Sequence, residues 1–249
     1  MSERTGLRAL LPVLLAGAAL AALAGCATTR QNLGSDFAGT LEPVRAPGRV
    51  GPCGEAYGAE EGMELSLIRQ QLDDERPRAA LAYLDKRAYP YPEAQLMQAE
   101  AMHRTGALAA SDARYRGLLA TCLKADGLRG LGRNAFAAGH ADEALRYLRE
   151  ARHADPADAR VRNDLGYLLL LRADYRAAAE ELMTALELDD GLERAANNLV
   201  LALLGAGEPA RAAAAAQRYR LAPAAQAALR AALARRPGAP AGASAAPSA

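Results

Sequence analysis

A repeat of 34 residues constrains the fold of this chain more than any other feature of its sequence. Leu131-Gly132 recurs as Leu165-Gly166, which sets the offset. The same offset brings three further residues of the first unit onto identical residues of the second, namely Ala144, Leu148 and Ala151 onto Ala178, Leu182 and Ala185. A second shift of 34 brings Leu165 onto Leu199. Self-similarity at this period is typical of stacked units, each of which contacts only its neighbours.

The spacing of small and apolar residues indicates what each unit is. The pattern is carried by Leu131, Gly132, Ala144, Leu148, Ala151 and Pro156. It resembles the tetratricopeptide repeat, a helix–turn–helix unit of 34 residues. Small residues at the three Gly and Ala positions would let the two helices approach closely, while leucines fill the seam between them. Departures from the pattern are Leu128 and Arg162 where an aromatic is usual, and Asp190 in place of the closing Pro.

Less regular units extend the repeat in both directions. Residues 91–124 have a turn at Gly106, and residues 62–90 predict two helices broken at 73–77. Residues 222–236 predict a final capping helix. The composition agrees, because Ala, Leu and Arg dominate and aromatics make up only 4%. We therefore expect an all-α superhelical solenoid of about five tetratricopeptide hairpins with a C-terminal capping helix, over residues 57–236.

The first 26 residues predict the cellular location of the protein. Arg4 and Arg8 precede a run of fourteen Ala, Leu, Val and similar residues at 9–22, as in a secretory signal peptide. The run ends in Leu-Ala-Gly-Cys at 23–26, which resembles the lipobox of bacterial lipoproteins. The resemblance implies lipidation of Cys26 and, because Ala27 rather than Asp follows, a lipid anchor on the periplasmic face of the outer membrane. The alternative is an ordinary signal peptide with an incidental cysteine.

Composition divides the rest of the chain. Residues 1–25 are the predicted signal peptide, and residues 26–56, rich in Pro, Gly and polar residues, are predicted to be a flexible spacer. Residues 237–249 form a low-complexity stretch predicted to be a disordered tail.

Two cysteines remain after Cys26, namely Cys53 and Cys122. In an oxidising periplasm they would form a disulfide that ties the N-terminal segment to the helical body. Two reduced thiols are the alternative, because two cysteines alone do not establish proximity.

The sequence predicts no catalytic or metal site and no cofactor. His103, His140 and His153 lie in separate units without ligand or base–nucleophile spacing. Gly-Leu-Arg-Gly-Leu-Gly at 127–132 lacks the Gly-Lys-Ser/Thr ending of a phosphate loop. The chain has 30 Lys and Arg against 29 Asp and Glu, and residues 1–25 hold two of the former and one of the latter, so the remainder is neutral. We therefore expect neither an enzyme with a small-molecule substrate nor a nucleic-acid-binding protein.

A binding surface is expected instead along the groove of the solenoid, where residues one period apart stack on one face. The fifth, ninth and twelfth positions of successive units supply a polar ladder and an apolar strip, whose candidate groove residues are Gln95, Arg129, Arg133, Phe136, Asn163, Tyr167, Asn197 and Leu201. Such a surface suits an extended or helical peptide. The alternative is that these residues only solvate the groove and fill its floor.

The segment at 163–212 narrows the functional expectation. Its Asn-Asp-Leu-Gly-Tyr opening at 163–167, the helix Glu-Leu-Met-Thr-Ala-Leu-Glu-Leu at 181–188 and the following Ala-Asn-Asn-Leu-Val-Leu-Ala-Leu-Leu at 196–204 resemble the tight adherence (Tad/Flp) pilus assembly lipoprotein. The resemblance implies a pilotin-like partner of the secretin or of another component of that machinery. The alternatives are an adaptor lipoprotein of β-barrel assembly and an adaptor of peptidoglycan enzymes.

Overall fold

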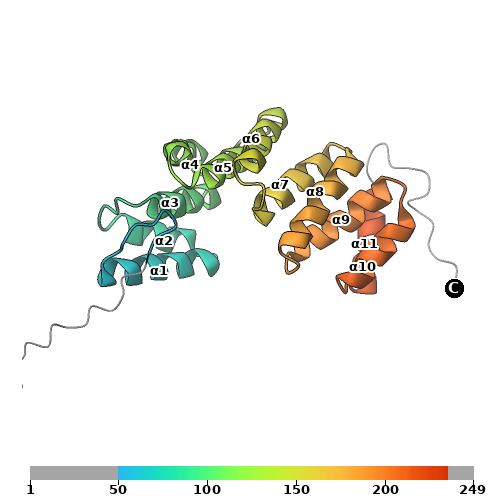
Figure 1. Cartoon of the computed structure of the whole chain (residues 1–249), viewed down its shortest axis with the longest axis horizontal. Helices are drawn as coiled ribbons and strands as arrows, with labels where there is room; N and C mark the ends of the chain where they lie inside the picture. The colour runs from blue at the N-terminus through green and yellow to red at the C-terminus, as the bar shows by residue number, and fades with distance from the viewer. Residues whose placement is uncertain (1–49, 235–249) are drawn as a thin grey trace, which may run out of the picture. The chain divides into compact units, whose positions relative to one another are not determined.

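The computed structural model describes residues 50–234, and within that range the chain is built from α-helices (Figure 1). In chain order the helices are α1 Ala59–Asp73, α2 Pro77–Leu84, α3 Pro92–Arg104, α4 Leu108–Gly117, α5 Lys124–Ala137, α6 Ala141–Ala154, α7 Ala159–Leu171, α8 Tyr175–Leu188, α9 Glu193–Gly205, α10 Pro209–Arg218 and α11 Pro223–Ala234. A short 3-10 turn, Leu118–Ala120, follows α4. No helix in this part of the chain has both the length and the hydropathy needed to cross a membrane.

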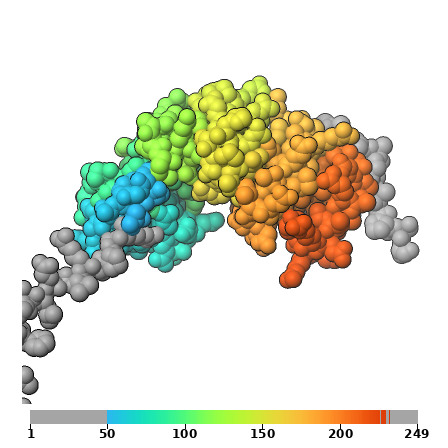
Figure 2. Space-filling model, viewed as in Figure 1, coloured from blue at the N-terminus to red at the C-terminus, as the bar shows by residue number. Residues whose placement is uncertain are grey.

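Ten of these helices form five consecutive hairpins, α1/α2 to α9/α10, and α11 packs against α9. The first helices of neighbouring hairpins also touch, α3 with α5, α5 with α7 and α7 with α9. Figure 2 shows the hairpins as successive bands of surface, from blue at the N-terminal end of the described region to red at its C-terminal end. The expected solenoid of about five helical hairpins with a capping helix is therefore confirmed.

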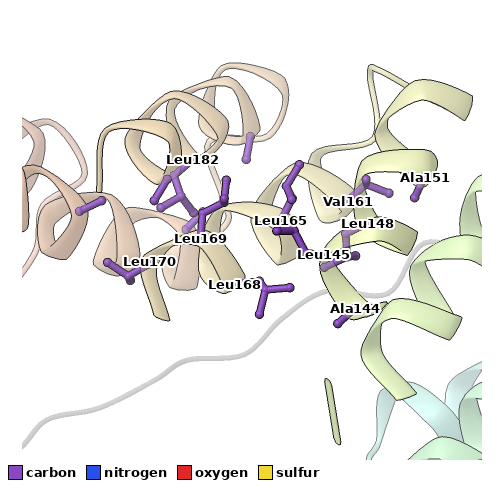
Figure 3. Packing of buried hydrophobic residues seen from close by; sticks show 14 of the residues in the cluster. Ala144, Leu145, Leu148, Ala151, Val161, Leu165, Leu168, Leu169, Leu170 and Leu182 are labelled. Atoms are coloured by element: carbon purple, nitrogen blue, oxygen red, sulfur yellow. The ribbon is translucent and has the colours of Figure 1, made fainter. Parts of the chain in front are cut away.

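Small residues bring the paired helices close together, as the repeat pattern predicts. A Cβ added to Gly132 on α5 would lie 2.9 Å from Cγ of Leu148 on α6, and one added to Gly166 on α7 would lie 2.6 Å from Cγ of Leu182 on α8. Real Cβ atoms do not approach carbons this closely, so only glycine fits. Both leucines are buried, and Figure 3 shows them among the apolar side chains between the helices.

The turns inside the hairpins use a left-handed backbone conformation. Gly106, Gly139 and Gly207 have φ of +82°, +84° and +77° at the turns of the second, third and fifth hairpins. At the same place in the first and fourth hairpins stand Glu75 with φ 58° and Ala173 with φ 61°. Glycine adopts this conformation without a steric penalty, whereas a residue with a Cβ does not. The fold therefore holds the turn even where the sequence lacks glycine.

The junction of the third and fourth hairpins contains a buried carboxylate. Glu181 on α8 is 7% exposed. It forms ion pairs with Arg152 on α6 and with Arg162 on α7, the latter at 2.8 Å between Nη1 and Oε2. A buried carboxylate needs such partners, because burial without them is costly. This cluster connects three helices of two hairpins.

The N-terminal end of the described region is held to the helices at two points. Cys53 and Cys122 form a disulfide with 5.5 Å between their Cα atoms, a usual distance for such a bond. Tyr57 is 3% exposed and donates a hydrogen bond of 2.5 Å to Glu93 on α3, which also pairs with Arg69 on α1. Residues 50–56, which composition assigns to the flexible spacer, thus form a fixed turn. Contacts with residues distant in the sequence hold this turn, and the composition of residues 50–56 does not indicate such contacts.

The predicted signal peptide, the lipidation site Cys26 and the predicted tail at 237–249 lie outside the described residues, as does the spacer up to residue 49. These assignments stay predictions.

Candidate functional site

A cleft of about 650 Å³ runs across the first helices of three neighbouring hairpins. Its lining residues come from α3, α5, α6, α7 and α9, and they are His103, Gly132, Arg133, Phe136, Ala137, Leu148, Asn163, Asp164, Tyr167, Leu168, Arg194, Asn197 and Asn198. We call this surface the α5–α7–α9 cleft. It draws on several hairpins because the first helices of the units lie side by side.

Five of the eight residues predicted for the groove line this cleft: Arg133, Phe136, Asn163, Tyr167 and Asn197. The 34-residue register explains the grouping. Residues at one position of successive repeats come from the same face of adjacent helices.

The other three predicted residues have different surroundings. Gln95 donates a hydrogen bond of 2.6 Å from Nε2 to the backbone carbonyl of Arg114, and it lines a separate pocket beside residues 87–92. Arg129 forms an ion pair of 2.7 Å with Asp164 on the next hairpin. Leu201 is half-buried and packs against the core. The polar ladder expected from the sequence is thus shorter than predicted, because two of its donors are already bonded within the protein.

An exposed aromatic pair contributes to the apolar lining of the cleft. The rings of Phe136 on α5 and Tyr167 on α7 meet edge to face, with 6.2 Å between centroids and 79° between planes. Each side chain is 40% exposed. Most large apolar side chains of these helices are buried, so two adjacent aromatic rings facing solvent offer apolar area to a partner.

An unsatisfied amide lies beside the aromatic pair. Oδ1 of Asn163, one turn before Tyr167 on α7, is buried and has no hydrogen-bond partner within the described part of the chain. Its Nδ2 makes a contact of 3.3 Å with Oδ1 of Asp164. A buried acceptor without a donor costs about 1–3 kcal/mol.

The charges around the cleft are unevenly paired. Arg104 forms an ion pair with Glu100, and Arg129 with Asp164. Burial opposes ionisation of Glu100, but the hydrogen bond and charge of Arg104 and the charge of Arg133 hold the pKa of this carboxyl below its ordinary value. Arg133 and Arg194, which both line the cleft, have no ion-pair partner among residues 50–234.

His103 on α3 also lines the cleft. Burial lowers the pKa of its imidazole, against the opposing effect of the 2.5 Å hydrogen bond between Nδ1 and Oδ1 of Asn134. The nearby charges of Arg133 and Arg104 also lower this pKa. The ring is therefore neutral at pH 7.

Sequence reasoning missed His103, Asp164, Arg194 and Asn198 as cleft residues. A signal for two of them exists, because Asp164 and Asn198 stand one period apart and directly follow Asn163 and Asn197. Arg194 stands one period after Arg160, whereas nothing in the repeat pattern marks His103.

The described residues offer no evident site for metal chemistry. Within 50–234, no three His, Cys, Asp or Glu side chains gather as metal ligands would. His140 is an exposed residue beside Glu143, and His153 lies near a different surface pocket on α6.

Comparisons with known proteins support the class of fold. No protein-family model matches the chain. TPR repeat-containing protein PA4299 of Pseudomonas aeruginosa is 36% identical over 156 residues, a stretch that makes up 62% of this chain. The chain spans 63% of the length of that relative.

Among solved structures, TTC0263, a thermophilic TPR protein of Thermus thermophilus, superposes with a TM-score of 0.56 at 23% identity. The match covers 70% of this chain and 99% of that structure. YrrB, described as a TPR protein with an unusual peptide-binding site, superposes with a TM-score of 0.47 at 15% identity, over 69% of this chain and 95% of that structure. The match to TTC0263 shows that the chain has the fold of tetratricopeptide-repeat proteins.

Proposed function

We propose that this protein is a lipid-anchored periplasmic scaffold that holds a segment of a partner protein in the α5–α7–α9 cleft. Within that role, we propose the Tad/Flp pilus machinery as its setting and the secretin, or another component of that machinery, as its partner. The lipobox ending at Cys26 supports the anchor on the outer membrane, and the motifs at 163–212 support the pilus setting.

One observation carries the protein-binding role, namely the exposed Phe136–Tyr167 pair next to the unsatisfied amide of Asn163. A peptide laid along the cleft would cover the two rings with an apolar side chain. If the Asn163 side chain turned toward the peptide, a backbone N–H could also donate to its unsatisfied Oδ1. Neither gain is available to the free protein, so both contribute to binding free energy.

The arrangement favours a macromolecular partner over a small ligand. The cleft is open, and its polar side chains come from four helices, α3, α5, α7 and α9. Binding energy spread over an extended surface is characteristic of peptide grooves.

The test is capture of outer-membrane proteins by the tagged full-length chain. Detergent-solubilised outer membranes from cells that assemble Tad/Flp pili are passed over the immobilised protein, and retained proteins are identified by mass spectrometry. We expect the secretin or another pilus component in the eluate. Tyr167→Ala should reduce its capture about tenfold or more, as removal of a central aromatic anchor does.

Two controls separate the parts of this proposal. Leu188→Ala removes an equally exposed apolar side chain from α8, outside the cleft, and should leave capture unchanged. Cys26→Ser tests the anchor in cells, where the protein should shift from the outer-membrane fraction to the periplasmic fraction.

Each contrary outcome has a distinct meaning. Barrel-assembly components or peptidoglycan hydrolases in place of pilus proteins would refute the pilus setting and leave the scaffold role. Equal capture by Tyr167→Ala and by the unchanged protein would refute the cleft as the binding site.

A further inference from the structure

We infer that the segment bound in the α5–α7–α9 cleft carries acidic side chains on both sides of a large apolar residue. This inference rests on the proposed function, since it assigns a chemistry to the occupant of the same cleft. The pairing of charges around the cleft supports it, and this pairing is independent of the aromatic pair and the Asn163 amide.

Asp164 is the one carboxylate that lines the cleft within the described part of the chain, and it is paired with Arg129. Glu100 on α3 is paired with Arg104. Arg133 and Arg194 line the cleft without a carboxylate partner in the described structure. With His103 neutral, the unpaired charge that faces an occupant is therefore positive. Arg133 is half-buried and Arg194 is exposed. Arginine attracts carboxylates through bonds that are both charged and directional.

The positions of the two arginines set where the acidic groups belong. Arg133 lies one turn before Phe136 on α5, and Arg194 lies one turn before Asn198 on α9. Helix α7, with Tyr167, lies between α5 and α9, because it contacts both. An apolar side chain seated on the Phe136–Tyr167 pair would thus have an arginine on either side of it. A segment with acidic residues before and after that apolar residue matches both arginines at once.

The opposite chemistry is disfavoured for the same reason. A lysine or arginine of the partner placed near Arg133 would meet an uncompensated like charge, which costs binding energy. The cleft therefore selects against basic segments as well as for acidic ones. Discrimination of this kind needs both contributions.

The experiment is selection of peptides from a random 12-residue library displayed on phage, with the tagged full-length protein in detergent as the target. The enriched peptides should contain Phe, Tyr, Trp or Leu with Asp or Glu within three residues on each side. The dissociation constant of one enriched peptide is then measured by fluorescence anisotropy. The double variant Arg133→Glu, Arg194→Glu should weaken it about tenfold or more at low salt. The difference should shrink at 0.5 M NaCl, where ionic screening is stronger.

Arg149→Glu is the matched control, because Arg149 is an exposed arginine on α6 that lines a different pocket. It should leave the affinity unchanged within twofold. Tyr167→Ala should abolish binding of every selected peptide.

The outcomes distinguish this inference from the proposal beneath it. Enriched peptides that depend on Tyr167 but are neutral or basic, or that bind the double glutamate variant equally well, would overturn the acidic-partner inference and leave the cleft as a binding site. Enriched peptides that bind Tyr167→Ala with full affinity, or the absence of any enrichment, would overturn both.

Discussion

Replacing Ala173 by glycine should stabilise the protein, although alanine is the better helix former and glycine removes a methyl group. Ala173 stands at the turn of the fourth hairpin with φ 61°, where Gly139 stands in the third with φ +84°. A left-handed conformation costs an L-residue about 1–2 kcal/mol. Glycine avoids that cost but loses about 0.5–1 kcal/mol more chain entropy on folding. Ala173 is exposed, so its methyl group contributes little packing.

The expected net gain is about 0.5–1 kcal/mol, and the reverse change supplies the matched test. Gly139→Ala puts a Cβ into the same conformation, and no atom lies within 4 Å of that Cβ, so the effect is conformational and not steric. It should destabilise the protein by about 0.5–1 kcal/mol.

Urea unfolding followed by circular dichroism at 222 nm measures both changes as shifts of the transition midpoint in opposite directions. Hydrogen exchange on α7 and α8 then localises the gain, since repeat proteins open in parts. A midpoint lowered by Ala173→Gly, or left unchanged by Gly139→Ala, would refute the reasoning.

Three further predictions concern stability. Serine at both Cys53 and Cys122 should lower the free energy of unfolding by up to roughly 4 kcal/mol, the chain-entropy value for a sequence separation of 69, and dithiothreitol should then have no effect on the midpoint. Gly166→Ala should lower the free energy of unfolding by about 1–2 kcal/mol, because a Cβ 2.6 Å from Cγ of Leu182 costs more than alanine gains in helix propensity. In the same unfolding assay, Gly166→Val should restore stability to a Leu182→Ala variant. Folding lowers the pKa of His103, so the unfolded chain binds a proton at this side chain before the folded chain does as the pH falls. The free energy of unfolding, measured by urea titration, should therefore decrease from pH 7 to 5. His103→Gln should remove the share of this decrease that comes from the imidazole.

In the proposed role, Arg133, Asn163 and Tyr167 would contact the partner, because all three line the α5–α7–α9 cleft. Variants at these positions should therefore change binding more than stability. The reverse is expected at the buried Glu181, whose ion pairs with Arg152 and Arg162 connect the third and fourth hairpins.

The candidate site was predictable only in part. Arg133, Phe136, Asn163, Tyr167 and Asn197 line one cleft, because equal positions of successive repeats occupy equal places on adjacent helices. Register does not say whether such a residue is free. Two donors of the predicted ladder, Gln95 and Arg129, are engaged by groups 19 and 35 residues away.

What the sequence by itself determines is the architecture. The 34-residue period, the small residues at the helix seams and the glycines at the turns specify five hairpins and a capping helix, because these features act within one unit or between a unit and its neighbour. Tertiary structure alone decides the rest: the disulfide between Cys53 and Cys122, the fixed turn at 50–56, and the unpaired charge of Arg133 and Arg194. Each of these features depends on the distance between atoms of separate units. A periodic sequence pattern does not predict that distance.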